Sequence, residues 1–282
     1  MPGQDGHESL TGFYGLSLAG ETHIPASARA ILIIVHGLGE HRGRYRAPAE
    51  RFRAAGVGTV AFDLRGHGES PGARTDIGSF ETFVSDLRQI VAGVAADNPG
   101  RALFLWGHSM GSLVAFGYVA ESPDLVSGVI TTGCPIAAFS PFFRRVAAAV
   151  SPLIRRFSGA RVTSHLDAAK LSHYEPIVAA YSADPAVIGT VSLRLGLEIA
   201  RVSTSTLERA PTVRTPWLAV HGGEDEIAPA EGSRLLIEAL GSRDKRLIVY
   251  ERLRHEVHNE TPDAAAVFYR TCVAWIAAHT RV

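Results

Sequence analysis

The chain has 282 residues, 46% of them hydrophobic and 20% charged, which fits one large globular domain or a core domain with an insertion. Its 28 basic and 28 acidic residues cancel, so no basic surplus favours a nucleic-acid partner. Two cysteines, Cys134 and Cys272, are too few for a disulfide framework. Because the sequence shows neither a signal peptide nor a run of roughly 18 apolar residues, we expect a cytoplasmic protein.

Short apolar runs alternate with helical patterns along the chain. Each run ends at a glycine or a polar residue, which is typical of parallel strands buried on both faces. The predicted strands are 31–35, 57–62, 102–106, 126–131, 217–220 and 246–250. The predicted helices are 45–55, 80–96, 112–121, 230–240 and 262–278. This alternation predicts a doubly wound α/β sheet, to which residues 12–18 add an antiparallel edge strand.

One long segment interrupts the alternation. Residues 134–206 contain no convincing strand, and their apolar, aromatic stretch is punctuated by Pro141 and Pro152. Roughly seventy residues are far more than a loop between a strand and a helix needs. We therefore expect a helical cap over the carboxyl edge of the sheet, with residues 1–133 and 207–282 forming the core.

The third predicted strand runs directly into Gly107, His108, Ser109, Met110 and Gly111, and a helical pattern follows. A G-x-S-x-G motif between a strand and a helix is typical of a nucleophile elbow, a strained turn that lifts the serine hydroxyl above the sheet. A Cβ at either glycine would clash where strand and helix approach each other. The motif predicts a serine hydrolase of the α/β-hydrolase fold, with a mostly parallel central sheet flanked by helices and the cap inserted after the sixth strand.

A serine nucleophile needs an orienting acid and a base, which in this fold follow later strands in the order Ser, Asp or Glu, His. The predicted strand 217–220 is followed by Glu224, Asp225 and Glu226. We favour Asp225, because its short side chain can reach back toward the sheet from just beyond a pair of glycines. The two glutamates are expected to be solvated loop charges.

The predicted strand 246–250 is followed by His255 and His258. We favour His255 as the base, because it comes first in the loop, whereas His258 lies closer to the helix that begins at Pro262. These two histidines are three residues apart, not four as in the zinc motif H-E-x-x-H, and no third ligand is evident. We therefore expect no metal and no cofactor.

An acyl-transfer site also needs N–H donors for the oxyanion. The residue after the nucleophile, Met110, supplies one backbone donor. The loop after the first predicted strand reads His36, Gly37, Leu38, Gly39, and its glycines allow a sharp turn. The backbone N–H of Leu38 is the best candidate for the second donor.

Five stretches of the chain can now be compared with known families: HGLGEHRGRY (36–45), FDLRGHGES (62–70), GHSMG (107–111), HGGEDEIAP (221–229) and RHEVHNE (254–260). Together they closely resemble the monoacylglycerol lipase and lysophospholipase-like family of α/β hydrolases. The resemblance covers nearly the whole chain and is weakest in the cap. It implies the same triad, Ser109, Asp225 and His255, and the same oxyanion donors, Leu38 and Met110.

The resemblance also implies that the cap is amphipathic, lines a tunnel for an acyl chain, and docks on membranes or lipid droplets. Six side chains either line this tunnel or form a simple cap core: Phe139, Phe142, Phe143, Leu153, Ile154 and Phe157. Four arginines are either solvated charges or contacts for anionic headgroups: Arg144, Arg145, Arg155 and Arg156.

The substrate implied by the family is a monoacylglycerol or a similar single-chain monoester. A lysophospholipase and a short-chain carboxylesterase of broad specificity stay alternatives, because the motifs encode the catalytic machinery and not the substrate. A non-catalytic ligand-binding protein on the same scaffold is a remoter alternative, since fold alone does not imply activity. The oligomeric state is not predicted.

Overall fold

The computed structural model describes residues 4–154, 160–163 and 166–280. Within them, eight strands form one sheet in the order β1-β2-β4-β3-β5-β6-β9-β10. These strands are β1 (Gln4–Thr11), β2 (Ser17–Ile24), β3 (Ala30–Val35), β4 (Gly58–Phe62), β5 (Ala102–His108), β6 (Gly128–Thr132), β9 (Trp217–Gly222) and β10 (Lys245–Tyr250). The pairs β1–β2 and β2–β4 are antiparallel and the others are parallel, so the predicted fold class is confirmed.

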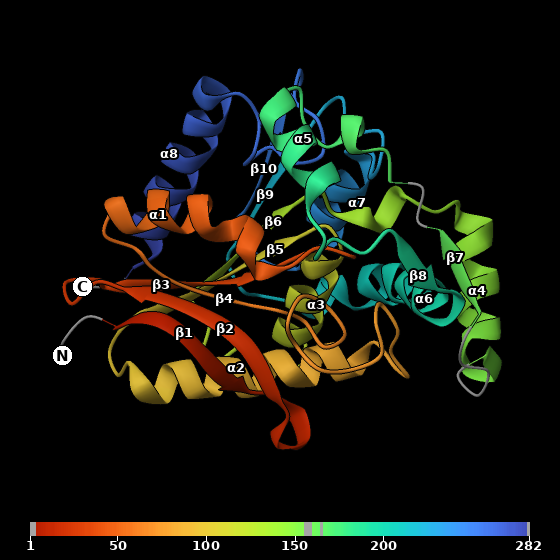
Figure 1. Cartoon of the computed structure of the whole chain (residues 1–282), viewed down its shortest axis with the longest axis horizontal. Coiled ribbons are helices and arrows are strands. Elements are labelled where there is room, and N and C mark those ends of the chain that lie inside the picture. The colour runs from red at the N-terminus through yellow and green to blue at the C-terminus, as the bar shows by residue number, and fades with distance from the viewer. Residues whose placement is uncertain (1–3, 155–159, 164–165, 281–282) are drawn as a thin grey trace.

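Helices cover both faces of the sheet (Figure 1). One face carries α1 (Arg46–Ala54) and α8 (Pro262–His279), and the other carries α2 (Glu81–Asp97), α3 (Met110–Val119) and α7 (Glu231–Ala239). Successive side chains of a strand point to opposite faces, so β3 contributes to two separate cores. Ile31 and Ile33 pack toward α2 and α3, whereas Leu32 and Ile34 pack toward α1 and α8. This is why the strands appear in the sequence as continuous apolar runs.

The N-terminal edge of the sheet is a hairpin, not the single strand predicted over residues 12–18. β1 and β2 are eight residues each, and the predicted strand falls largely on the turn between them, where η1 (Phe13–Gly15) lies. β1 gave no apolar run because almost all of its side chains are exposed. The hairpin could therefore not be found from hydrophobic patterning.

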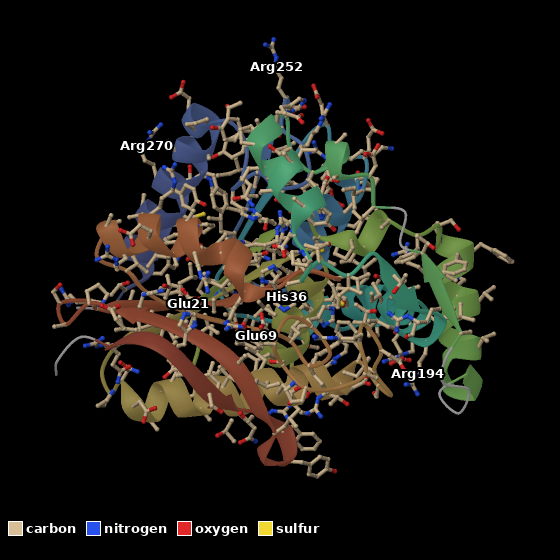
Figure 2. The ribbon with its side chains drawn as sticks, in the orientation of Figure 1. Glu21, His36, Glu69, Arg194, Arg252 and Arg270 are labelled. Atoms are coloured by element: carbon tan, nitrogen blue, oxygen red, sulfur yellow. The ribbon has the colours of Figure 1, made fainter. Side chains whose placement is uncertain are left out.

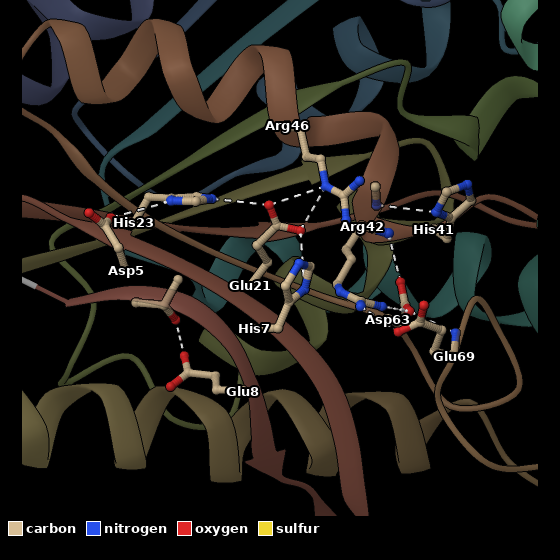
Figure 3. A network of polar contacts seen from close by, with 12 residues as sticks. Asp5, His7, Glu8, Glu21, His23, His41, Arg42, Arg46, Asp63 and Glu69 are labelled. Atoms are coloured by element: carbon tan, nitrogen blue, oxygen red, sulfur yellow. Dashed lines mark hydrogen bonds and ion pairs between the residues drawn. The ribbon is translucent and has the colours of Figure 1, made fainter.

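Ion pairs hold the hairpin against the core (Figure 3). Glu21 on β2 accepts a hydrogen bond from Nε of Arg46 at 3.0 Å and lies 3.1 Å from Nε2 of His23. Nearby, Arg42 pairs with the fully buried Asp63 and, at 2.6 Å, with Glu69. These contacts also fix η2 (Arg42–Tyr45), the short helix that follows the predicted oxyanion loop.

Between β6 and β9 the chain forms α4 (Pro141–Ile154), α5 (Glu175–Ala183) and α6 (Leu193–Arg209). In Figure 1, α4 and α6 lie at the right-hand end of the molecule, whereas α5 lies at the top, near the middle. Two three-residue strands, β7 (Arg161–Thr163) and β8 (Thr190–Ser192), pair antiparallel within this insertion. The expectation that it contains no strand is therefore wrong, because strands this short leave no periodic pattern. The expected boundary after residue 206 falls inside α6, whose last turn continues to Arg209.

The direction in which strands are added to the sheet reverses between β3 and β5. β4 pairs with one side of β3, whereas β5 pairs with its other side and the later strands follow beyond β5. In such sheets, ligands bind outside the carboxyl ends of the strands at this switch point. The register pairs Val35 with Gly107, so the loops that follow β3 and β5 meet there.

Candidate active site

Ser109 lies on the tight turn between β5 and α3, with φ 51° and ψ −122°. This left-handed conformation is rare for a residue with a side chain, so the predicted strain at the elbow is confirmed. A Cβ at Gly107 would lie 2.4 Å from the carbonyl oxygen of Gly111, and a Cβ at Gly111 would lie 2.1 Å from that of Val35. Only glycine fits at these two positions, because the elbow is pressed between α3 and the end of β3.

Asp225 and His255 follow β9 and β10, and the structure brings them together. Nδ1 of His255 lies 2.7 Å from Oδ2 of Asp225, and both side chains are buried. The other carboxylate oxygen, Oδ1, accepts the backbone N–H groups of Ile227 at 2.9 Å and Ala228 at 2.8 Å. Three contacts thus orient the carboxylate so that one oxygen faces the imidazole.

His221 is a second partner of Asp225. Its Nε2 lies 3.0 Å from Oδ2 of Asp225 and 2.7 Å from the carbonyl oxygen of Ala228, so this nitrogen carries the proton. Its Nδ1 lies 2.7 Å from the hydroxyl of Ser233, which therefore donates to it. In the sequence, His221 was recognised only as the residue that ends a strand. Its spacing of four residues from Asp225 was the one signal that could have identified it as a partner of the acid.

The ring of His255 packs in a space that a glycine leaves open. A Cβ at Gly133, where φ is 59°, would lie 2.7 Å from Cε1 of His255. The ring of His108 lies beside it, with centroids 4.7 Å apart. Ser109 and His255 line the same cavity, although within the part of the chain that the structure describes no hydrogen bond joins the two side chains.

Burial keeps two histidines of the site neutral, whereas nearby carboxylates keep a third one basic. Burial lowers the pKa of His255, but the carboxylates of Asp225, Glu256 and Glu40 together raise it more, so this pKa lies above its ordinary value. Burial and the nearby His255 lower the pKa of His108 to about 3. Burial likewise lowers the pKa of His258 to about 4. His255 is therefore the one of these three that can take up a proton near neutral pH.

Two unused backbone N–H groups lie beside the serine, one on the loop after β3 and one at the start of α3. A Cβ on Gly37 would lie 3.1 Å from Cβ of Ser109, so this loop passes directly over the elbow. Among the described residues, no hydrogen bond uses the N–H groups of Leu38 and Met110, which both line the cavity. His36 sits in the interior beneath this loop (Figure 2), with Nδ1 2.7 Å from the carbonyl oxygen of Gly37.

A buried ion cluster supports the same loop. Oε1 of Glu40 accepts the N–H of Gly37 at 2.6 Å and the hydroxyl of Tyr45 at 2.9 Å. Arg44 donates to Glu40 at 2.6 Å and to both oxygens of Glu256 at 2.7 and 2.8 Å. Burial raises the pKa of Glu40, but nearby positive charge, above all that of Arg44, outweighs burial and lowers this pKa to about 2. Arg44 likewise outweighs burial and holds the pKa of Glu256 well below its ordinary value, so both carboxylates are ionised.

A cavity of about 270 Å³ lies over Ser109. We call its two sides the core wall, from the loops after β3, β5, β9 and β10, and the insertion wall, from the segment between β6 and β9. The insertion wall consists of Pro135, Ala138, Phe139, Leu166, Leu171, Tyr181 and Ile199. The core wall carries the polar groups and the insertion wall is almost entirely apolar.

Comparisons with known proteins agree on the family. A family model described as Serine aminopeptidase, S33 matches residues 26–262. The chain belongs to this hydrolase family. It is 35% identical to the monoacylglycerol lipase of Mycolicibacterium smegmatis over 96% of both chains, and 31% identical to human monoglyceride lipase over 89% of this chain and 84% of that one. The crystal structure of Paleococcus ferrophilus monoacylglycerol lipase superposes with a TM-score of 0.82 at 31% identity, covering 93% of this chain and 99% of that one. The resemblance to the monoacylglycerol lipase group is confirmed.

Several side chains of this hydrolase lie elsewhere than the sequence suggested. Of the six apolar residues expected in the acyl tunnel, Phe139 lines the cavity, whereas Phe142 and Phe143 are exposed on α4 at 77% and 41% and do not. Phe143 stacks on Phe139, with ring centroids 5.6 Å apart, on the side away from the cavity lining. The side chains of Leu153 and Ile154, and the whole of Phe157, lie outside the described residues.

The structure also shows where the residues considered as alternative acids and as an alternative base lie. Glu224 and Glu226 are exposed and pair with His173 and Lys170, so neither faces His255. His258 is buried and stacks on Tyr45, with ring centroids 5.6 Å apart. Of the four arginines, Arg145 is exposed, Arg144 is partly buried, and Arg155 and Arg156 lie outside the described residues.

Neither a membrane-spanning helix nor a cluster of metal-ligating side chains is found in the described ranges. No helix among them combines the length and hydropathy needed to cross a bilayer. No group of three or more His, Cys, Asp or Glu side chains among them is arranged to hold a metal ion. The free thiols of Cys134 and Cys272 are both buried.

Proposed function

We propose that this chain hydrolyses monoacylglycerols or similar single-chain monoesters through an acyl-enzyme on Ser109. One observation carries the proposal. A serine on a strained elbow shares a cavity with a histidine bound to a buried aspartate, in a chain 35% identical over 96% of its length to a monoacylglycerol lipase. The proposed location is the cytoplasm, and the two free, buried thiols support it.

In the proposed mechanism, His255 takes the proton of Ser109 as Oγ attacks the ester carbonyl. Asp225 holds the imidazole in the required tautomer and stabilises the imidazolium that forms. The N–H groups of Leu38 and Met110 donate to the oxyanion. His255 then gives its proton to the leaving alcohol. Water, deprotonated by the same histidine, attacks the acyl-enzyme and releases the carboxylic acid and free Ser109.

The insertion is proposed to receive the acyl chain and to act as the lid of the site. The apolar insertion wall supports this role, since an acyl chain gains free energy by leaving water for apolar surroundings. On the outside of α4, Phe142 and Val146 expose 77% and 39% of their surface, with Phe143 beside them. We propose that this face contacts lipid surfaces peripherally.

Hydrolysis of graded substrates tests the proposal. Wild-type and Ser109→Ala proteins would be compared on monoacylglycerols, lysophospholipids and p-nitrophenyl esters of increasing chain length. We expect the highest kcat/KM on monoacylglycerols and no turnover by the variant. Higher kcat/KM on lysophospholipids or on the shortest esters would reject the proposed substrate, and turnover by the variant would reject the mechanism.

A further inference from the structure

The insertion does more than cover the cavity: its segment 169–174 is bonded to the loop that carries His255. The N–H of Glu256, directly after His255, donates to the carbonyl oxygen of Leu171 at 2.8 Å. Directly before His255, the side chain of Arg254 donates to the carbonyl oxygens of Ala169 and, at 3.2 Å, of Ser172. Both neighbours of the base are therefore held by residues far away in the sequence, Glu256 through its peptide N–H and Arg254 through its side chain.

Glu260 joins the two segments. Its carboxylate is only 1% exposed, and Oε1 accepts the backbone N–H of Arg254 at 2.8 Å. His173 supplies two more donors, its backbone N–H to Oε2 and its Nδ1 to Oε1, both at 3.0 Å. A buried carboxylate must be satisfied by such donors, since leaving it unpaired is costly. The hydroxyl of Ser172 adds a longer contact to Oε2 at 3.4 Å. The insertion thus supplies three of the four donors to this carboxylate, and the base loop supplies the fourth.

The same imidazole reaches the loop that carries the acid. Nε2 of His173 lies 3.1 Å from Oε2 of Glu224, the residue before Asp225. Both ring nitrogens therefore face carboxylate oxygens, which can only accept hydrogen bonds. The acid and base loops already pack closely, since a Cβ on Gly222 would lie 2.2 Å from the carbonyl oxygen of Arg254. His173 connects them on their outer side.

We propose that Glu260 and His173 are positioning residues for the Asp225–His255 pair. Glu260 fixes the backbone at Arg254 and thereby the origin of the His255 side chain, and His173 ties this loop to the loop of Asp225. Neither residue touches the substrate. The inference rests on the proposed function, because it assigns the two residues an effect on the rate of acylation at Ser109.

Two variants and a matched control test the proposal on a soluble p-nitrophenyl ester. In Glu260→Gln, N–H donors face both oxygen positions of the former carboxylate. The NH₂ group of the amide therefore opposes an N–H donor in either orientation of the amide. In His173→Ala, the link is lost at a side chain that is 34% exposed, so folding is not at risk. Because small displacements of catalytic groups are costly, we expect kcat to fall about tenfold in each variant, with KM changed by less than about twofold.

Asp86→Asn is the control. Asp86 is another buried carboxylate that accepts a backbone N–H, from Phe13 at 2.7 Å, and pairs with an arginine, but it lies on α2 against the turn of the N-terminal hairpin. This variant should lower Tm and keep the wild-type kcat. His173→Arg should restore most of the activity, because a guanidinium can donate to both Glu260 and Glu224. The double variant of Glu260 and His173 should be no slower than the slower single variant, since both act through one link.

The outcomes separate this proposal from the proposed function. If His173→Ala lowers only Tm, as Asp86→Asn does, and kcat stays at the wild-type value, the positioning role is overturned while Ser109-dependent hydrolysis stands. If hydrolysis does not depend on Ser109, both proposals fail. If Glu260→Gln does not fold, His173→Ala and its rescue by His173→Arg decide the question alone.

Discussion

The two walls of the cavity are built on different principles. On the core wall and directly behind it, Glu40, Glu256 and Asp225 are each satisfied by two or more donors. The insertion wall presents carbon atoms, among them the side chains of Phe139 and Ile199. Fixed polar groups are what an acyl-transfer reaction needs, because they stabilise charge without rearranging. An apolar wall can only favour or exclude parts of a substrate. The difference assigns the chemistry to one wall and the fit of the acyl chain to the other.

The insertion also has two parts, one bonded to the catalytic loops and one exposed to solvent. Segment 169–174 is bonded to the base loop through Leu171 and His173. By contrast, α4 exposes phenylalanines to solvent. Part of the insertion is therefore integrated into the catalytic framework, and a lid that opens by moving as one body would break those bonds. We expect any opening to be confined to the side of α4.

The largest effect is expected on the core wall, from Asp225→Asn. An amide would present an N–H to one of its donors and would no longer fix the His255 tautomer, so kcat should fall about 10³- to 10⁴-fold. Glu226→Gln, next to it but exposed, is the control and should retain full activity. Steady-state kinetics on a short ester measures both. A loss below about tenfold in Asp225→Asn would show that His255 does not depend on this carboxylate.

The next effect is the pH dependence of kcat/KM. A protonated His255 cannot accept the proton of Ser109, and Asp225 raises the pKa of His255 above about 6.5. Activity should therefore rise with pH through a midpoint above about 6.5, and fall about tenfold for each pH unit below it. Rates between pH 4.5 and 9 would locate the midpoint. An acid limb centred below pH 6 would contradict the pairing with Asp225.

A smaller effect is expected when the insertion wall is filled. Ala138 lines the cavity and is exposed, so Ala138→Trp occupies part of the roughly 270 Å³ without overpacking the core. We expect kcat/KM on long-chain p-nitrophenyl esters to fall about tenfold, and that on the acetate ester to change little, as for loss of pocket contacts. Ala149→Trp, on an exposed position of α4, is the matched control. An equal loss of kcat/KM on esters of all chain lengths would show that the substitution disturbs the catalytic groups and not the binding of the acyl chain.

The smallest effect is expected on the outer face of α4. Replacing Phe142 and Phe143 by serine removes exposed apolar surface, which should reduce vesicle binding and lower hydrolysis of vesicle-bound substrate about three- to tenfold. Hydrolysis of a dissolved short ester should stay at the wild-type rate. Cosedimentation with phosphatidylcholine vesicles measures the binding directly. Equal sedimentation of variant and wild type would exclude this face as the lipid contact.

The sequence predicted the features that depend on local pattern. The strands of the parallel sheet were placed to within two residues of their observed ends, because they are continuous apolar runs bounded by glycine or polar residues. The elbow was predicted because its two glycines and the strained serine are adjacent in the chain. Asp225 and His255 could be selected because the fold fixes their order after later strands.

The features that could not be predicted depend on contacts between distant segments. The link of His173 to Glu260 spans 87 positions, and neither residue belongs to a pattern that reveals the other. The direction of Phe142 and Phe143 depends on how α4 packs against α6, which an apolar stretch does not specify. The β1–β2 hairpin is held by polar pairs, and β7 and β8 are too short to show a period.

The central claim is an acyl-enzyme on Ser109, and covalent trapping tests it most directly. Wild-type protein would be treated with a fluorophosphonate, and the intact mass and the modified peptide would be determined by mass spectrometry. The account predicts one adduct per chain, on the Ser109 hydroxyl, and none in Ser109→Ala. An adduct on another residue, or undiminished labelling of the variant, would contradict it.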